Sequence, residues 1–220
     1  MDKINKQGRS QEERRRATTN KLIEATITCV NEKGYSGLKA SAIAKQAGVT
    51  WGAAQHLFGD KEILLLTVAN RTYEELSLAL SADISIDLSL DEKVERIVSI
   101  TWKAFQSEAY QAMVEILRGS RAHPEFNREV LKRQKTVSED VRVMWLRLFT
   151  PSGIDEGMID EARDFVTLTL SGLAARKIFL HNSKNVRQIL NNLSHAALTI
   201  LQREGDCAPQ SEGENLSALI

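Results

Sequence analysis

The 220-residue sequence has little proline, glycine or aromatic character: three prolines, twelve glycines and 5% aromatic residues. A β-sandwich or β-barrel needs many tight turns, and glycine and proline supply most of the turn conformations. Because both are scarce beside many strong helix formers, the composition favours an all-α fold. A hydrophobic fraction of 42% allows a full buried core and excludes a disordered or collagen-like chain.

Long apolar runs and paired cysteines are also missing. No stretch reaches the ~18 uninterrupted apolar residues of a membrane span, and the first fifteen residues are polar where a secretory signal is apolar. We therefore expect a cytoplasmic protein without membrane contact. Cys29 and Cys207 lie far apart, so they provide neither a disulfide framework nor a metal quartet. Cys29 falls within an apolar helical pattern and is expected in the core.

The sequence has no net charge, since 29 basic residues balance 29 acidic ones. Residues 1–61 nevertheless contain 11 Lys and Arg against 6 Asp and Glu, and the remainder contains 18 against 23. A basic front end on a mildly acidic body predicts that the first quarter meets a polyanion. Chance variation of surface charge would give the same count, so the charge needs the support of a motif.

Apolar residues recur at helical spacing along most of the chain. Ser10 and Glu13, and again Ser89 and Glu92, have the spacing of capping boxes that open helices. Residues 82–91 alternate like a half-buried strand, but a lone strand would have no partner, so a helix start at Ser89 is preferred. The expected helices cover about 11–33, 41–47, 51–58, 61–80, 90–105, 108–122, 125–149, 156–182 and 185–204.

Two short helices separated by Gly48, Val49 and Thr50 carry the most informative pattern. A short helix, a turn with glycine and a second short helix opened by a Ser or Thr cap form a helix-turn-helix, whose second helix enters the DNA major groove. Gly48 suits the left-handed turn position, Val49 fills the angle between the helices, and Thr50 caps the second helix. The motif agrees with the basic front end.

From Ile43 to Glu62 the chain reads IAKQAGVTWGAAQHLFGDKE. This run resembles the DNA-binding motif of the TetR/AcrR family of repressors, and the resemblance covers about residues 14–65. It implies an N-terminal arm and a three-helix DNA-binding domain over 1–60 and a helical regulatory and dimerisation domain over 61–204. From about Gly205 onward the apolar pattern ends, and we expect a disordered tail over 205–220. The implied partners are a second copy of the chain and double-stranded DNA with a palindromic operator.

The resemblance also implies which residues contact DNA. Base or groove contacts are implied for Trp51, Gly52, Ala53, Gln55 and His56, and phosphate contacts for Lys39, Ser41, Thr50 and Lys61. The side-chain chemistry fits, since Gln bonds adenine with both amide atoms and Ala meets a thymine methyl. The family often has Tyr at the position of Gln55 and Thr at that of Lys39, so these two contacts do not transfer in detail.

Three of these basic or aromatic features have a second interpretation. Trp51 is either a groove residue or a core aromatic, although Ala54, Leu57 and Phe58 are expected to fill the inward side of its helix. His56 is either a DNA contact or an ordinary surface histidine. The run Arg14 to Arg16 is either a solvated face or a contact to phosphates or the minor groove.

The last two helices have more apolar positions than one core face requires, and small residues that allow close helix approach. We expect them to form the homodimer interface, with Leu193 and Ala197 within it. The positions at spacings of three and four are Phe165, Leu168, Gly172, Ala175, Phe179, Val186, Leu190, Leu193, Ala197 and Ile200.

Catalytic signatures are missing from the body. It has no G-x-S-x-G, phosphate loop, H-E-x-x-H or Cys/His pair at ligand spacing, so we expect no enzyme, metal or cofactor. Glu115, Arg118, Arg121 and His123 form either a salt-bridged helix face or the polar contacts of a pocket. The family resemblance implies an effector cavity, near which we expect residues that equally suit a core: Trp102, Phe105, Tyr110, Met113, Leu117, Trp145 and Phe149.

The resulting hypothesis is a sequence-specific DNA-binding transcriptional regulator, a dimeric repressor released by a small-molecule effector. Two alternatives stay open. The first is a constitutive DNA-binding or scaffolding protein without a ligand. The second is an enzyme whose helical body carries catalysis while the basic end binds a nucleotide substrate, and the missing catalytic spacings weigh against it.

Overall fold

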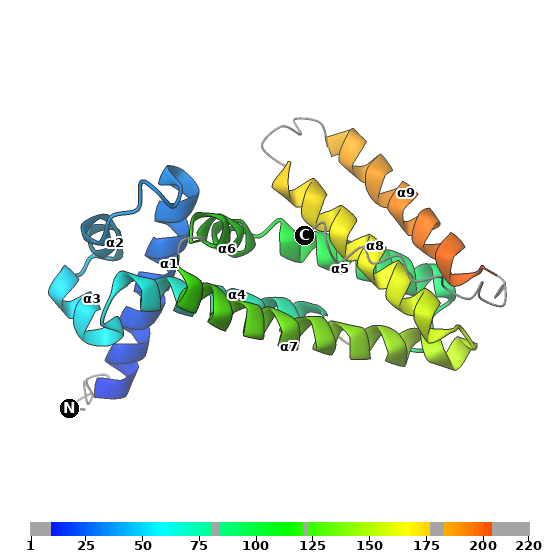
Figure 1. The fold of residues 1–220 in the computed structure, drawn as a ribbon, viewed down its shortest axis with the longest axis horizontal. Helices are drawn as coiled ribbons and strands as arrows, with labels where there is room; N and C mark the ends of the chain where they lie inside the picture. Colours follow the sequence, from blue (N-terminus) through cyan, green and yellow to red (C-terminus); the bar gives the residue numbers. More distant parts are fainter. Residues whose placement is uncertain (1–9, 81–83, 121–122, 177–182, 204–220) are drawn as a thin grey trace, which may run out of the picture.

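The computed structural model describes residues 10–80, 84–120, 123–176 and 183–203, and over these residues the chain is helical with no strand (Figure 1). The predicted all-α fold is confirmed. The elements are α1 (Gln11–Lys33), α2 (Ala40–Ala47), α3 (Trp51–Phe58), α4 (Lys61–Leu80), α5 (Leu90–Phe105), α6 (Glu108–Gly119), α7 (Pro124–Phe149), the 3-10 turn η1 (Thr150–Ser152), α8 (Glu156–Ala175) and α9 (Ser183–Leu201).

The predicted helix starts are confirmed by their caps. Ser10 and Glu13 form a complete capping box at α1, and Ser89 and Glu92 form another at α5. Residues 84–89 form no strand, as expected from the lack of a partner. The expected end of α6 near 122 is wrong, because α6 ends at Gly119. The tail over 205–220, Cys207 and Phe179 lie outside the described residues, as does part of the predicted extension of α8 to 182.

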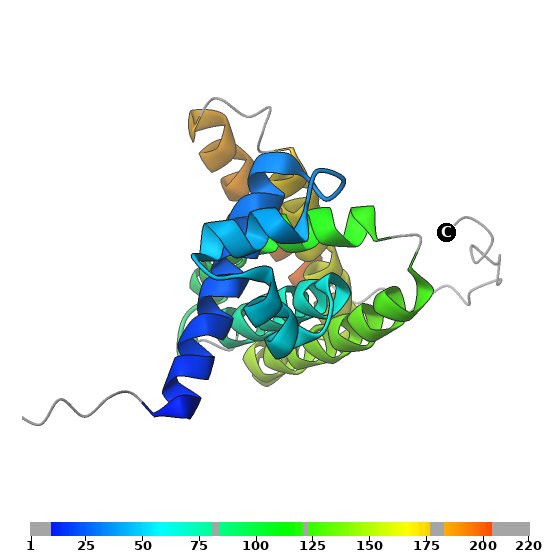
Figure 2. The ribbon, with the colours of Figure 1, turned by 90° about the vertical axis from the view of Figure 1, so that its left-hand side faces the viewer.

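The helices are arranged along the length of an elongated molecule. In Figure 1, α1, α2 and α3 lie at one end of the long axis and α8 and α9 lie at the other. Between them, α4 packs along α7, and α5 packs against both α8 and α9. Figure 2 views the molecule from the end that carries α1 to α3. Because α1 also packs on α6, the end that carries α1 to α3 is in direct contact with the middle helices.

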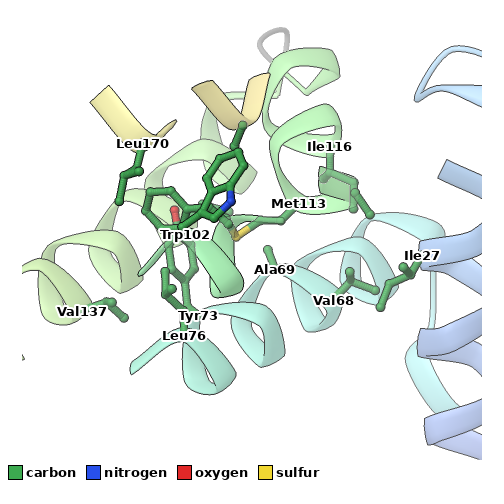
Figure 3. Close-up of a cluster of buried hydrophobic side chains, with 14 of the residues drawn as sticks. Ile27, Val68, Ala69, Tyr73, Leu76, Trp102, Met113, Ile116, Val137 and Leu170 are labelled. Atoms are coloured by element: carbon green, nitrogen blue, oxygen red, sulfur yellow. The ribbon is translucent and has the colours of Figure 1, made fainter. Parts of the chain in front are cut away.

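One continuous apolar cluster runs from α1 to α9, and Figure 3 shows part of it. Leu22, Ile43 and Leu64 at one end and Trp145 and Phe149 further along are all almost fully buried. Cys29 is buried as predicted, and burial raises the pKa of its thiol. None of the helices in the described part is long and apolar enough to cross a membrane. The boundary at residue 60 stays a prediction, since the core continues across it.

The expected place of Leu193 and Ala197 in a dimer interface is wrong. They are 3% and 0% exposed within a single protomer, because α9 uses its wide apolar arc to pack against both α5 and α8. The large apolar side chains that these two helices leave exposed lie on α8 instead: Phe165 is 39% exposed and Leu168 is 71% exposed. Of these two helices, α8 is therefore the one that leaves large apolar side chains uncovered in the described part of the chain.

Candidate functional site

The helix-turn-helix is held together by small and branched apolar residues. Ile43, Ala44 and Ala47 of α2 and Ala54 of α3 are buried, and the missing bulk at the alanines lets the two short helices approach closely. Gly48 joins them at φ 69° and ψ 32°, the left-handed conformation that the sequence predicts. The turn therefore fixes how α3 projects from the domain.

The outer face of α3 gathers most of the predicted base-contact residues. Gly52, Ala53, Gln55 and His56 are exposed, whereas Ala54 between them is fully buried. The Thr50 hydroxyl accepts a hydrogen bond from the Ala53 backbone N–H at 3.2 Å and caps the helix. This face presents one amide, one imidazole and two small residues, which suits close approach to base edges.

The position of Trp51 lies between the two predicted ones, a groove residue and a core aromatic. It is half-buried and packs against the apolar core, as Leu57 and Phe58 also do. The expectation that other residues fill the inward side and leave Trp51 to the groove alone is therefore wrong. The reason is that α3 is only two turns long, so its first residue still reaches the core.

The start of α2 offers a second set of donors. Lys39 and Ser41 are exposed, and no side chain caps this helix. Within the described residues, the backbone N–H groups of Ala40 and Ser41 have no acceptor. An uncapped helix N-terminus flanked by a lysine is a favourable place for a phosphate.

Lys61 has partners that the sequence did not suggest. Its ammonium lies 3.5 Å from the Leu38 carbonyl oxygen and 5.4 Å from the centre of the Tyr35 ring. These contacts fasten the start of α4 to the loop between α1 and α2. Its phosphate contact stays a prediction, because an ammonium has three donors and these contacts do not use all of them.

A second feature is a partly open cavity of about 330 Å³ lined by residues of α4, α5, α6, α7 and α8. Five of the seven residues expected near a cavity line it: Phe105, Tyr110, Met113, Leu117 and Trp145. Phe105 and Tyr110 stack with their ring centres 4.4 Å apart and their planes within 8°. Trp102 and Phe149 are absent from the lining and belong to the packed core instead.

Polar residues that the sequence pattern did not indicate also line this cavity. Tyr73 and Thr101 line it although they are only 6% and 4% exposed. Burial raises the pKa of Tyr73 to about 12, and burial also raises the pKa of Tyr110. In the sequence, Tyr73 and Thr101 occupy core-facing positions of a helical pattern. The signal of a polar site was that each of them brings a hydroxyl to a face that is otherwise apolar.

The cluster around Glu115 is not part of this cavity. Glu115 Oε1 accepts a hydrogen bond from the Tyr35 backbone N–H at 3.3 Å, and neither Glu115 nor Arg118 lines the cavity. Arg121 lies outside the described residues, and His123 is exposed. Of the two open interpretations, the pocket contact is therefore wrong for Glu115 and Arg118. Glu115 instead connects α6 to the loop that precedes α2.

Comparisons with known proteins agree with the helix-turn-helix and with the whole helical arrangement. The profile of bacterial regulatory proteins of the tetR family matches residues 22–68. The HTH-type transcriptional regulator CymR of Pseudomonas putida is 25% identical over 190 residues, which is 84% of this chain and 91% of CymR.

Solved structures show the same fold at lower identity. The TetR-family regulator PfmR of Thermus thermophilus superposes with a TM-score of 0.56 at 18% identity, covering 82% of this chain and 96% of PfmR. The superantigen PfiT superposes with a TM-score of 0.66 at 17% identity, covering 85% of this chain and 97% of PfiT. Because a superantigen shares the fold, the assignment rests on the matched DNA-binding segment and the long alignment with CymR. On that basis, residues 22–68 form a DNA-binding segment of the tetR type, and the chain is a DNA-binding transcriptional regulator similar to CymR along most of its length.

Proposed function

We propose that this regulator is a homodimeric repressor that leaves its operator when a small molecule enters the cavity between α4 and α8. The observation that carries the proposal is the position of α6. One helix lines the cavity and also contacts the DNA-binding end, so a change in the cavity is transmitted by packed, hydrogen-bonded residues.

The two ends of α6 have different neighbours. Toward its start, Tyr110 and Met113 line the cavity. The Glu108 carbonyl oxygen accepts a hydrogen bond from Asn31 Nδ2 of α1 at 3.0 Å. Toward its end, Gly119 lies so close to Tyr35 that a Cβ at this position would be 2.5 Å from the Tyr35 Cβ. Since Tyr35 also contacts Lys61, a shift of α6 would act on both α1 and α4.

The dimer follows from the apolar residues left on α8. A charge-free stripe at Phe165, Leu168 and Gly172 is exposed on one protomer, and a two-fold axis through it would bury the same stripe of a second copy. A two-fold dimer presents two α3 helices in opposite directions, which requires a palindromic operator. We place the protein in the cytoplasm, where bacterial DNA lies.

The alternative of a constitutive DNA-binding or scaffolding protein has less support. A protein with no ligand would gain stability by filling the cavity, whereas this one leaves the hydroxyls of two buried residues facing it. The enzyme alternative requires a nucleophile bonded to a base, and in the described part of the chain no hydroxyl of the cavity lining bonds to Asp164, the carboxylate of that lining.

Sequencing genomic DNA fragments retained by the purified protein tests the DNA-binding part of the proposal. We expect a palindromic site with half-sites about one helical turn apart. Gln55→Ala should change the preferred base at one position of each half-site at a cost of about 1–3 kcal/mol, because a base-edge contact is lost. Lys39→Ala should instead weaken all sequences equally and lower the slope of affinity against salt. Retention of fragments without a shared motif would contradict the proposal.

Trp51 gives a prediction that depends on its half-buried position. Trp51→Ala should lower the free energy of unfolding by about 1–2 kcal/mol, between the values typical of surface and fully buried sites. It should also weaken operator binding by more than this loss explains, measured on the folded protein by fluorescence anisotropy. Trp51→Phe should restore most of the stability. Equal operator affinity of the folded Trp51→Ala protein and the wild type would restrict Trp51 to packing.

A further inference from the structure

We propose that the cavity between α4 and α8 takes a small, uncharged, aromatic molecule with one oxygen function, a carbonyl or a hydroxyl, bound by Tyr73 and Thr101. This inference rests on the proposed function, since it names the chemical class of the effector. It is carried by three features of the cavity: the hydroxyls of two buried residues that face it, apolar and aromatic walls, and an ion pair that is already complete.

The hydroxyls of Tyr73 and Thr101 are the groups that would bond to the ligand oxygen. Tyr73 on α4 and Thr101 on α5 are both more than nine-tenths buried and both line the cavity. Neither hydroxyl bonds to another described residue, and neither oxygen is sealed off, because Arg133 Nε is the buried side-chain atom without a partner in the described part of the chain. Figure 3 shows Tyr73 reaching from α4 toward Trp102 in the middle of the helices. Both oxygens face the cavity, so a ligand oxygen placed between them can form the hydrogen bonds that the surrounding protein does not supply.

The neighbouring threonine shows that the free hydroxyls are not a general feature of these helices. Thr72, also buried on α4, donates to the Val68 carbonyl oxygen at 2.9 Å. Thr101 could form the same bond to its own helix and does not. Tyr73 keeps its proton across the physiological range because burial holds its pKa at about 12, so it acts as a donor. A ligand oxygen that accepts a hydrogen bond matches this donor.

The walls determine the rest of the ligand. Phe105 and Trp145 are almost fully buried, and the stacked Phe105 and Tyr110 rings present flat surfaces beside Met113. Flat aromatic walls favour a planar aromatic guest through offset or edge-to-face contacts. A volume of about 330 Å³ lies at the small end of the ~300–1,000 Å³ range of small-molecule sites, which limits the ligand to one or two fused rings.

The charged residues of the lining argue against an anion. Arg163 and Asp164 are the charged side chains that line the cavity, and their Nη2 and Oδ1 atoms lie 2.8 Å apart. Arg163 also pairs with Asp160, which in turn accepts from Arg142 Nε at 3.0 Å. The guanidinium of Arg163 is therefore already paired with two carboxylates. A ligand carboxylate would lose its hydration in the cavity without gaining an unpaired cation, which is unfavourable.

Three naphthalenes of nearly equal shape test the class. The full-length protein is titrated by calorimetry with 2-acetylnaphthalene, 2-ethylnaphthalene and 2-naphthoate. We expect the ketone to bind about three- to tenfold more tightly than the hydrocarbon, the gain typical of one neutral hydrogen bond. The carboxylate should bind at least about tenfold more weakly than the ketone. Tighter binding of 2-naphthoate, or no binding of any of the three, would overturn the inference.

Two substitutions assign the oxygen contact. Tyr73→Phe and Thr101→Val should each reduce the preference for ketone over hydrocarbon, and the double variant should bring it close to one. Thr72→Val is the matched control, since its hydroxyl is bonded within its own helix, and it should leave the preference unchanged. Both test variants remove an unpartnered hydroxyl, so their melting temperatures should equal or exceed that of the wild type. An unchanged preference in the double variant, or loss of folding in both single variants, would contradict the inference.

Operator release is measured in the same samples, so that this inference and the proposed function can fail separately. Cavity binding of the ketone without loss of DNA affinity would support the ligand class and overturn the effector role. Release of DNA by 2-naphthoate alone would support the effector role and overturn the ligand class.

Discussion

Replacing both Phe165 and Leu168 with Asp should convert the protein from dimer to monomer. These two residues are the large apolar side chains that α8 leaves exposed, and two carboxylates there would be buried without partners in a two-fold interface. Sedimentation should show a single monomeric species at the concentration at which the wild type is dimeric. Operator affinity should fall at least about 100-fold, because each half-site then binds separately.

Leu78→Asp is the control for this experiment. Leu78 on α4 is 74% exposed, as much as Leu168, but it lies on a different helix from the proposed interface. The control should stay dimeric and keep its operator affinity. A double variant on α8 that sediments as a dimer would mean that another surface holds the two copies together.

Gly119→Ala should be the most destabilising single-methyl change at a helical glycine in the described part of the chain. A Cβ at Gly119 would overlap the Tyr35 ring and lie 2.5 Å from the Tyr35 Cβ, so a rotamer change alone cannot relieve the clash. We expect a loss of about 1–3 kcal/mol, the usual cost of overpacking. Calorimetry should show a melting temperature lower by about 2–4 °C for each kcal/mol.

Gly52→Ala is the matched control and should have the opposite sign. Gly52 lies on the exposed face of α3, and its Cβ would meet only Thr50 Oγ1 at 4.0 Å. Alanine in a helix is more stable than glycine by about 0.5–1 kcal/mol, so the melting temperature should rise. Equal melting temperatures for Gly119→Ala and the wild type would mean that α6 and the loop at Tyr35 separate easily, and would remove this contact from the proposed path between cavity and DNA.

The predictions that depended on local chemistry agree closely with the structure. Ser10, Ser89 and Thr50 cap helices where the sequence places them, and Gly48 has the left-handed conformation. Each of these features is decided within four residues of chain, by a hydroxyl that reaches a nearby N–H or by the absence of a Cβ. The bounds of α3 could be predicted for the same reason.

The predictions that depended on partners far along the chain were less accurate. The periodicity of α9 marks Leu193 as apolar, but a pattern of apolar residues cannot say whether α5, α8 or a second protomer covers it. Trp51 likewise sits at a helix start that favours DNA, yet the distance from α3 to the core leaves it half-buried. Covering surfaces belong to other helices, so local sequence does not contain them.

The sequence by itself determined the all-α fold, the helix-turn-helix and the residues on the outer face of α3, because caps, turn glycines and apolar spacing are short-range physical constraints. Only the tertiary structure brought Tyr73 and Thr101 from α4 and α5 to one cavity, and left Phe165 and Leu168 of α8 uncovered. In sequence both hydroxyls stand at core positions and differ in no way from Thr72, whose hydroxyl is satisfied within its own helix. Whether a buried polar group is bonded or free depends on what the packing of other helices places beside it, and that is settled when five helices close around a common space.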